Sequence, residues 1–551
     1  MSMITATTWV RRGVAAPFPT KYEIDEEELN RISELAKLQL QDAKLDLKEA
    51  QDKEEKGDTE MDTEEEGGVS VEGSGKGKGK ESKKKDDDSD DDDDLKEYDL
   101  DNYDSEEKDE DGEKVTMFGN IKSLVYHQPE EEDPYLVVPE GAENDDEEEE
   151  REELQIMTTD NLLLAAKVED EVAHMEVYVY EDEADNLYVH HDIMLPAIPL
   201  CVEWLDMPVG KGTEGRANGN FVAVGTMEPD IEIWDLDIVD CMYPNAILGL
   251  GGQDEESELK QKKKKKKAKK ANDEYHVDSV LALAANRQHR NLLASGSADQ
   301  TVKLWDLNTT KCAKSYTNHT DKICSLDWHP KESTVLLSGS YDRTIVAADM
   351  RAPDAKAARW SVDSDVEAVR WDPHDPNFFY VTTDSGMVYC HDVRNASPKP
   401  ESSKPVWMLQ AHDSSVSAFD VNAHIPGFIV TGSMDKKVKL WNIQDNKPNM
   451  VVSRKLEVGK VFSTTFAPDQ EVSFRLAVAG SKGTVQIWDT STNAAVRHTF
   501  AGRLGVSATE TPVEERILGV AQDDSNDSDS DEGQQGDDHG EPDGWESMDE
   551  D

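Results

Sequence analysis

Two segments of the sequence carry a histidine, an aspartate and a tryptophan in the same order. The two sets are His276, Asp299 and Trp305, and His412, Asp435 and Trp441. A histidine beside a carboxylate is the pair of groups that general acid–base catalysis uses. The set recurs within one chain, however, which favours a buried structural network over a single active site. We therefore expect these residues to stabilise a repeated fold, with no catalytic residue among them.

A dense basic run is the second feature with chemical potential. Its nine lysines are Lys260, Lys262, Lys263, Lys264, Lys265, Lys266, Lys267, Lys269 and Lys270, in a chain whose formal net charge is -60. Such a run could be a nuclear or nucleolar localisation signal, or an arm that contacts the phosphates of RNA or nucleosomal DNA. It could also be a solvated charge run that folds back onto acidic tails. It contains no aromatic residue, so it does not resemble a base-stacking surface.

Most of the negative charge lies in two tails. Residues 1–157 hold 52 acidic and 20 basic residues, and residues 521–551 hold 14 acidic and none basic, which leaves a net of -14 for residues 158–520. Segments this rich in charge and poor in aromatics cannot bury enough apolar surface to offset chain entropy. We expect disorder over residues 1–114 and 506–551, and a partly ordered acidic lead-in over 115–157.

The acidic blocks allow several roles. They include "DDDSDDDDD" at 86–94 and "DDSNDSDSDEG" at 523–533. They could bind basic partners such as histones or ribosomal proteins, shield the protein from RNA, or only increase solubility. Ser89 and Ser528 each precede an acidic residue by three positions, which suits an acidophilic kinase, and phosphorylation would add further negative charge.

The N-terminal region differs from the rest of its tail. Trp9 stands beside Arg11 and Arg12, and we expect its side chain to be exposed. Residues 25–50 then show apolar side chains at helical spacing, which predicts an amphipathic helix that begins near Asp25; these are Ile32, Leu35, Ala36, Leu40, Ala43 and Leu47. This helix could dock on a partner or on the folded body, or the periodicity could be incidental.

The folded middle of the chain is a repeat. Six similar segments, such as "SGSADQTVKLWDL" (295–307) and "TGSMDKKVKLWNI" (431–443), share one position, occupied by Trp234, Trp305, Ala348, His391, Trp441 and Trp488. The spacings are 305−234 = 71, 348−305 = 43, 391−348 = 43, 441−391 = 50 and 488−441 = 47. Four of the five lie near the period of roughly 40–45 residues typical of WD40 repeats.

These segments resemble the WD40 family, which implies an all-β propeller. We expect seven blades over residues 158–505, the first of them a degenerate blade at 160–192, and eight if residues 115–127 add another. The lysine run then falls in an inter-blade insertion, residues 251–275, which accounts for the long spacing. The resemblance also implies that His, Asp and Trp share a buried hydrogen-bond network, and that Ala348 and His391 weaken their blades locally and form no metal site.

Several functional classes lack their sequence signals. The five cysteines include no CxxC pair, and the sequence contains no phosphate-binding GxxxxGKS loop, no HExxH motif and no nucleophile elbow. No apolar stretch approaches the roughly 20 residues of a membrane span, and the N-terminus has no hydrophobic signal core. We expect a non-enzymatic protein of the cytoplasm or nucleus, without cofactor, metal, membrane contact or small-molecule substrate.

A narrower resemblance follows from segments outside the repeats. The opening "WVRRGVA", the acidic N-terminal region, "VTMFGNIKSLVYH" (115–127) and "HMEVYVYEDEADNLYVHHD" (174–192) resemble the periodic tryptophan protein 1 family. This resemblance implies a nuclear, largely nucleolar scaffold in ribosome biogenesis, with pre-ribosomal proteins or ribosomal RNA as partners.

Two other functions remain open. The first is a histone-binding chromatin factor. The second is a substrate adaptor of a ubiquitin ligase, because Arg351 and Arg394 end the segments "ADMR" and "HDVR", which keep the D-x-R part of the WDxR box of such adaptors.

Overall fold

The computed structural model describes residues 2–22, 151–250, 271–504 and 515–520, apart from short gaps at 153, 171, 211–212, 214, 353–356 and 397–402. Several predicted features lie outside these residues. They are the amphipathic helix at 25–50, the strand at 115–127 that would have added a blade, the nine lysines, and Ser89 and Ser528.

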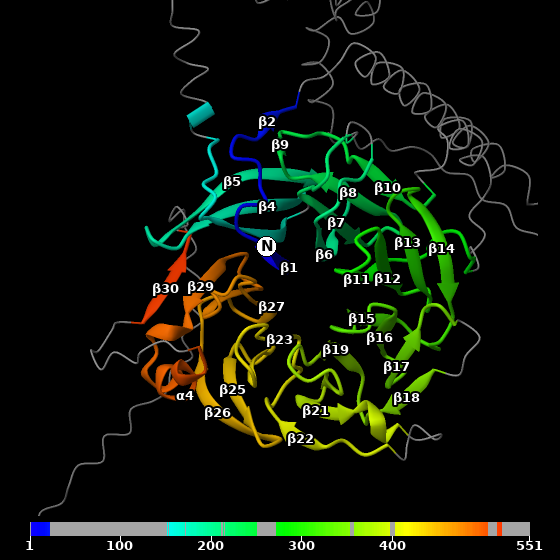
Figure 1. Ribbon diagram of the computed structural model, residues 1–551, viewed down its shortest axis with the longest axis vertical. Coiled ribbons are helices and arrows are strands. Elements are labelled where there is room, and N and C mark those ends of the chain that lie inside the picture. The colour runs from blue at the N-terminus through cyan, green and yellow to red at the C-terminus, as the bar shows by residue number, and fades with distance from the viewer. Residues whose placement is uncertain are drawn as a thin grey trace, which may run out of the picture. The chain divides into compact units, whose positions relative to one another are not determined.

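Within the described residues, seven four-stranded antiparallel sheets form a ring (Figure 1), as the repeats predict. The innermost strands are neighbours in the order β1, β6, β11, β15, β19, β23 and β27, and β27 lies next to β1 again. A single sheet of this kind cannot bury both of its faces, so each packs against the sheets on either side. The seven-bladed propeller predicted from the sequence is confirmed.

The first three blades run from the innermost to the outermost strand as follows. Blade 1 is β1 (Ser2–Val10), β3 (Asn161–Glu169), β4 (Val172–Glu181) and β5 (Asn186–Leu195). Blade 2 is β6 (Pro199–Leu205), β7 (Phe221–Thr226), β8 (Ile231–Asp235) and β10 (Ala246–Leu248). Blade 3 is β11 (Val280–Ala285), β12 (Leu292–Ser297), β13 (Val302–Asp306) and β14 (Lys311–Tyr316).

The other four blades have the same plan. Blade 4 is β15 (Ile323–Trp328), β16 (Val335–Ser340), β17 (Thr344–Asp349) and β18 (Ala358–Ser361). Blade 5 is β19 (Val366–Trp371), β20 (Phe378–Thr383), β21 (Met387–Asp392) and β22 (Trp407–Gln410). Blade 6 is β23 (Ala418–Val421), β24 (Phe428–Gly432), β25 (Val438–Gln444) and β26 (Lys447–Arg454). Blade 7 is β27 (Val461–Phe466), β28 (Arg475–Gly480), β29 (Val485–Asp489) and β30 (Arg516–Gly519).

A few short elements complete the described body. β2 (Thr20–Lys21) pairs in parallel with β9 (Ile238–Val239) beside blade 2, and the helix α4 (Ala494–Leu504) follows blade 7. The 3-10 turns η4 (Val393–Asn395) and η6 (Thr490–Thr492) follow β21 and β29. None of the helices among the described residues is long and apolar enough to cross a membrane.

The ring has two faces, which the strand directions define. The upper face carries the turns between the second and third strands of each blade and the loops that join one blade to the next. The lower face carries the loops between the first and second strands and between the third and fourth strands.

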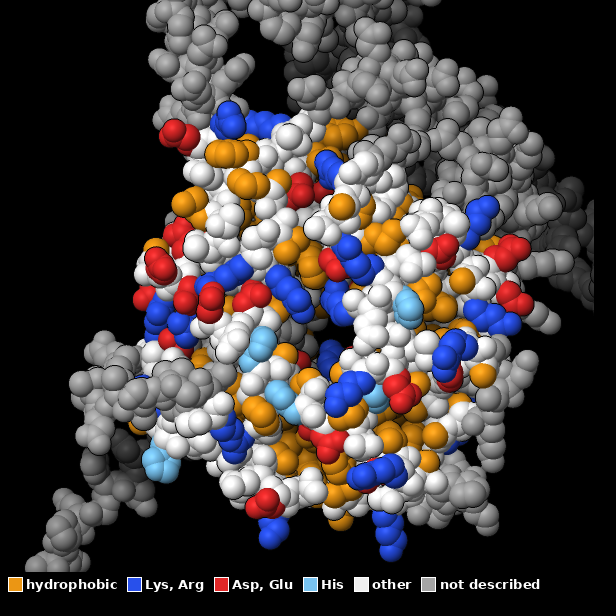
Figure 2. Space-filling model, viewed as in Figure 1, with side chains coloured by type: hydrophobic (Ala, Val, Ile, Leu, Met, Phe, Trp, Pro, Cys, Tyr) orange, Lys and Arg blue, Asp and Glu red, His pale blue; other side chains and the backbone are white. Residues whose placement is uncertain are grey.

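On the face drawn in Figure 2, basic and acidic side chains are interspersed around the central opening. The excess negative charge of the chain is therefore not a property of that face.

The N-terminus corrects one prediction. Residues 1–114 were expected to be disordered with Trp9 exposed, but Ser2–Val10 form the innermost strand of blade 1, and Trp9 is only 6 % exposed. β1 pairs with β3 along its length, so the blade is completed by a strand about 150 residues earlier in the chain. Period-2 patterning in "MITATTWV" is compatible with a strand, but nothing local in it indicates so distant a partner.

The C-terminal boundary was also too short. The propeller was predicted to end at residue 505, yet β30 forms the outermost strand of blade 7 through pairs that include Trp488 with Ile517. The lead-in likewise contributes to the body, because Ile156 is buried and its N–H donates to the Pro17 carbonyl at 3.0 Å. Residues 271–275, the end of the predicted insertion, are described and form a loop without strand or helix.

Candidate functional site

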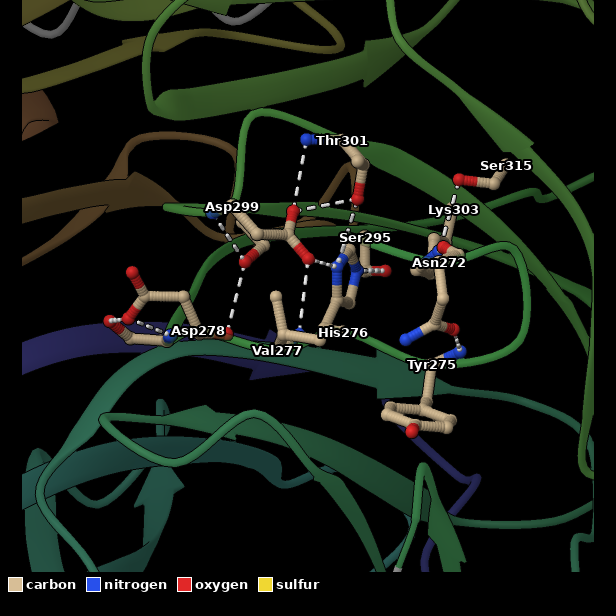
Figure 3. A network of polar contacts seen from close by, with 12 residues as sticks. Asn272, Tyr275, His276, Val277, Asp278, Ser295, Asp299, Thr301, Lys303 and Ser315 are labelled. Atoms are coloured by element: carbon tan, nitrogen blue, oxygen red, sulfur yellow. Dashed lines mark hydrogen bonds and ion pairs between the residues drawn. The ribbon is translucent and has the colours of Figure 1, made fainter. Parts of the chain in front are cut away.

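The predicted residues of blade 3 are joined by a continuous series of hydrogen bonds, of which Figure 3 shows Asp299, His276 and Ser295. His276 Nδ1 lies 3.0 Å from Asp299 Oδ2, and its Nε2 lies 2.7 Å from Ser295 Oγ. Trp305 Nε1 donates to the same Ser295 oxygen at 2.8 Å. With Nδ1–H of the imidazole donated to the Asp299 carboxylate, the serine hydroxyl donates to Nε2 and accepts the indole N–H. Every polar group of the set then has a partner.

Blade 6 has the same arrangement with a threonine. His412 Nδ1 lies 2.9 Å from Asp435 Oδ2, and Thr431 Oγ1 lies between His412 Nε2 and Trp441 Nε1, at 2.8 and 2.9 Å. The structure therefore brings together both predicted sets. The hydroxyl that links each histidine to its tryptophan was missed from the sequence, although it stands ten residues before the tryptophan in both blades.

Blade 4 holds a third histidine–aspartate pair, which sequence reasoning also missed. His319 Nδ1 lies 3.1 Å from Asp342 Oδ2, and its Nε2 lies 2.8 Å from Ser338 Oγ. Ala348 occupies the tryptophan position and leaves Ser338 without an indole donor. The pair was missed because Ala348 replaces the tryptophan that marks a repeat. The "SGSYD" segment, which contains Asp342 and comes before Ala348, is the sequence feature that indicates the pair.

Burial gives these pairs a structural character. The histidine side chains of the three pairs are 0 % exposed. Burial lowers the pKa of His276, so its imidazole is held neutral. Burial alone would raise the pKa of Asp299, but hydrogen bonds with His276 and Thr301 outweigh it and lower that pKa to about 2. Both ring nitrogens of each histidine are engaged in hydrogen bonds and fully buried, which favours stabilisation over proton transfer.

Lys303 extends the blade 3 network toward the lysine insertion. Its side chain is fully buried, and Nζ donates to the Asn272 carbonyl and to Ser315 Oγ, the latter at 3.0 Å (Figure 3). Asn272 Oδ1 in turn accepts the N–H groups of Glu274 and Tyr275, both at 2.8 Å. The chain that follows the insertion is therefore fixed on the upper face of blade 3.

The other end of the insertion lies on the same face. Leu250 is the last described residue before it, and its N–H donates to Asp230 Oδ1 at 2.8 Å in the upper turn of blade 2. The nine lysines lie outside the described residues. Both of their attachment points thus belong to the upper face, at the junction of blades 2 and 3.

His391 fills the tryptophan position of blade 5 as an aromatic ring. It is 1 % exposed, stacks on Phe379 with ring centroids 5.3 Å apart, and finds no hydrogen-bond partner for either nitrogen among the described residues. Burial lowers its pKa to about 4. No group of three histidine, cysteine, aspartate or glutamate side chains in the described part of the chain could hold a metal ion.

The two arginines of the adaptor hypothesis each pair with an aspartate of the same segment. Arg351 Nη2 lies 2.7 Å from Asp349 Oδ2, and Arg394 Nη2 lies 2.7 Å from Asp392 Oδ2. Both guanidinium groups remain largely exposed, at 72 % and 62 % of the side chain. A partner that binds them would meet an ion pair and not an isolated cation.

The inner strands line a cavity of about 260 Å³ at the centre of the ring, rich in serine and threonine hydroxyls. Two carboxylates of the inner strands link neighbouring blades: Asp327 accepts the N–H of Trp371 at 2.7 Å, and Asp420 accepts that of Phe466 at 2.8 Å. Burial raises the pKa of both acids, to about 6 for Asp327, and the Arg370 guanidinium opposes the rise. These acids hold the ring together.

Ring closure depends on the N-terminal segment. Trp9 Nε1 donates to the Thr465 carbonyl of blade 7 at 3.1 Å, just as Trp371 Nε1 donates to the Asp327 carbonyl across the blade 4–5 junction at 3.2 Å. Arg12 Nε donates to Asn161 Oδ1 of blade 1 at 2.8 Å. Its Nη1 lies 2.9 Å from Glu471 Oε2 of blade 7. The "WVRRG" segment thus joins the first and last blades.

The comparisons with known proteins agree with this architecture. A family model described as WD domain, G-beta repeat matches residues 272–306, 310–347 and 403–442. These are the segments that contain the three histidine–aspartate pairs. An uncharacterized WD repeat-containing protein of Schizosaccharomyces pombe is 47 % identical, with 96 % of this chain and 97 % of that protein covered.

Two further relatives decide the family. Periodic tryptophan protein 1 of Saccharomyces cerevisiae is 39 % identical, over 91 % of this chain and 90 % of that protein. The chain belongs to the periodic tryptophan protein 1 family. A Drosophila melanogaster protein named as a periodic tryptophan protein 1 homolog is 29 % identical, over 91 % of this chain and 96 % of its own length. The matches to the family span the propeller and the segments before it, so this chain is a WD-repeat scaffold of that family.

Proposed function

We propose that this protein is a non-catalytic scaffold of nucleolar ribosome biogenesis, acting in large-subunit precursor maturation or in ribosomal RNA gene expression. The observation that carries the proposal is the attachment of the nine-lysine insertion on the upper face of a propeller from the periodic tryptophan protein 1 family. A run of lysines neutralises phosphates without reading base sequence, which suits attachment to a large RNA-containing particle.

The non-catalytic part of the proposal has its own support. The histidine–aspartate pairs are enclosed and fully hydrogen-bonded, and Asp327 and Asp420 on the inner strands accept backbone N–H groups of neighbouring blades. A rigid ring with these internal networks presents its surface to partners, for which we propose pre-ribosomal proteins, ribosomal RNA or both.

The test is gradient sedimentation of the tagged full chain from a nuclear extract, with and without RNase. We expect migration in large particles that RNase collapses. Light migration with histones co-purifying regardless of RNase would replace this proposal with a chromatin function.

The lysine insertion is tested in the same system. Deletion of residues 260–270 should leave the melting temperature unchanged and reduce both nucleolar retention and the particle-bound fraction. Replacement of the four exposed lysines Lys311, Lys314, Lys331 and Lys447 by glutamine is a control on the ring itself and should change neither. Unchanged localisation and sedimentation after the deletion would contradict the role of the insertion.

A further inference from the structure

Blades 6 and 7 carry a group of lysines on the upper face, here called the basic rim. It consists of Lys436, Lys437, Lys455, Lys460 and Lys482. All five are exposed, and none forms an ion pair with another of the described residues. The acids of the same loops are Asp435, which pairs with His412, and Glu457. The basic rim thus holds a local excess of positive charge in a chain with a net charge of -60.

Backbone hydrogen bonds make the loops of the basic rim one continuous surface. The Val461 N–H donates to the Ser433 carbonyl at 3.2 Å, which joins the upper turn of blade 6 to the start of blade 7. The Ser481 N–H donates to the Lys460 carbonyl at 2.9 Å, and the Lys460 N–H donates to Ser481 Oγ at 2.9 Å. These bonds hold the three loops that carry the lysines against one another.

The C-terminal strand ends beside this surface. β30 runs upward along β29, from the pair Arg516–Asp489 to the pair Gly519–Gln486, so it points at the turn that carries Lys482. Val520, the last described residue, packs partly against the same apolar cluster as Val485. The chain thus leaves the propeller at the basic rim.

The sequence that follows has the opposite charge. Residues 521–551 contain 14 acidic residues and no lysine or arginine, and the first carboxylates are Asp523 and Asp524. An extended chain spans about 3.3–3.6 Å per residue, so these carboxylates come within roughly 10–14 Å of Val520. No long linker is needed for them to reach the lysines.

We propose that the acidic C-terminal segment, residues 521–551, docks on the basic rim of its own propeller and covers it. One exposed ion pair contributes little to stability, but several pairs act together here. The tether also gives the segment an effective concentration of order millimolar at the rim. Such contacts weaken at high salt, because the screening length falls from about 10 Å at 0.1 M to about 3 Å at 1 M.

The test is zero-length carbodiimide cross-linking of the full chain, with the linked peptides identified by mass spectrometry. In 50 mM salt, we expect intramolecular links from carboxylates of 521–551 to lysines of the basic rim, reduced at least fivefold in 1 M salt. Links that go only to the lysines of 260–270, or as often to Lys311 and Lys314 on β14 as to the basic rim, would overturn the proposal. So would the absence of links to the rim.

A pair of charge-reversal variants provides an independent measurement. The rim variant carries K436E, K437E, K460E and K482E, and the matched control carries K311E, K314E, K331E and K447E, so both change the net charge equally. We expect the rim variant to have a larger Stokes radius than the control at low salt, with the difference lost in 1 M salt. Equal Stokes radii would overturn the proposal, provided that both variants melt within a few degrees of the unmodified protein.

Discussion

The individual blades solve the same bonding problem with different residues. In blades 3 and 6, a hydroxyl receives the indole N–H of the tryptophan, whereas in blade 2 Trp234 Nε1 donates to Glu232 Oε2 at 3.1 Å. Glu232 stands at the position that Lys303 holds in blade 3, by the register of the strand pairs. Burying a carboxylate reduces the stability of the fold more than burying a hydroxyl does. The stability of the protein should therefore show that blade 2 uses Glu232 as the acceptor.

The loss of stability caused by the buried Glu232 carboxylate should vary with pH. Burial, with Glu228 and Asp230 nearby, raises the pKa of Glu232 from its usual value near 4.5 to about 7, although the Trp234 hydrogen bond opposes this. The folded protein then binds the proton more tightly than the unfolded chain, so stability decreases as pH rises from about 4.5 to about 7. Glu232→Gln keeps an acceptor oxygen and removes the charge. It should increase the free energy of unfolding by about 1–2 kcal/mol at pH 8 and by almost nothing at pH 5.

Urea denaturation at the two pH values measures this effect. The exposed Glu274→Gln removes the same charge from the adjoining upper surface and is the matched control, for which we expect no gain. A gain for Glu232→Gln that is the same at both pH values would contradict the assignment of the effect to the buried charge.

The linking hydroxyls give a second prediction at this scale. Ser295→Ala leaves two buried groups unpaired, Trp305 Nε1–H and His276 Nε2, whereas Ser338→Ala leaves one, His319 Nε2. An unsatisfied buried polar group costs about 1–3 kcal/mol. We therefore expect Ser295→Ala to destabilise the protein by about 2–4 kcal/mol and Ser338→Ala by about half as much. Thr431→Val, which keeps the shape of the threonine, should behave like Ser295→Ala, and equal urea midpoints for the two serine variants would disprove the network assignment.

At the scale of elements, the sequence predicts what is local. The upper turns, the third strands and the histidine–aspartate sets lie within one repeat, so their spacing identifies them. Two kinds of feature were not predicted from the sequence: small or unmarked residues within a repeat, and strands whose partners are distant along the chain. Ser295, Thr431 and the His319–Asp342 pair are small or lack the tryptophan that marks a repeat. The acidic region separates β1 from its partner β3, and the helix α4 with the residues after it separates β30 from β29; hydrophobic periodicity does not report on such distant pairing.

The same limit explains the error at Trp9. Because Trp9 stands beside Arg11 and Arg12 and ahead of an acidic region, the sequence predicts an exposed indole. In the structure its ring packs edge-on against Tyr180, with centroids 6.0 Å apart, and the neighbouring Arg12 finds its partners in blades 1 and 7. Each of these partners is more than 140 residues away along the chain. Only the closed ring brings them together around Trp9 and Arg12, so the sequence near Trp9 does not reveal its burial.

At the scale of the whole molecule, β1 makes the propeller a ring and not an open stack of sheets. β1 is the innermost strand between blades 7 and 2 and bonds to both of them. Thr5 Oγ1 donates to the Pro199 carbonyl of blade 2 at 2.8 Å, and the Thr7 N–H donates to Ser463 Oγ of blade 7 at 3.2 Å. Gly483 is required at the upper end of this seam, because a Cβ there would meet Ser2. A weakened β1 should therefore open the ring at one place.

Trp9→Ala tests this closure. Truncation of a buried tryptophan costs about 3–5 kcal/mol, whereas Trp9→Phe keeps the ring packing and loses mainly the hydrogen bond to Thr465, at about 1 kcal/mol. In hydrogen exchange, Trp9→Ala should deprotect β3 and β27, which adjoin β1, and leave β15 and β16 on the opposite side of the ring protected. Loss of protection that is equal in all seven blades would instead mean that the ring unfolds as one cooperative unit and that β1 is no special closure.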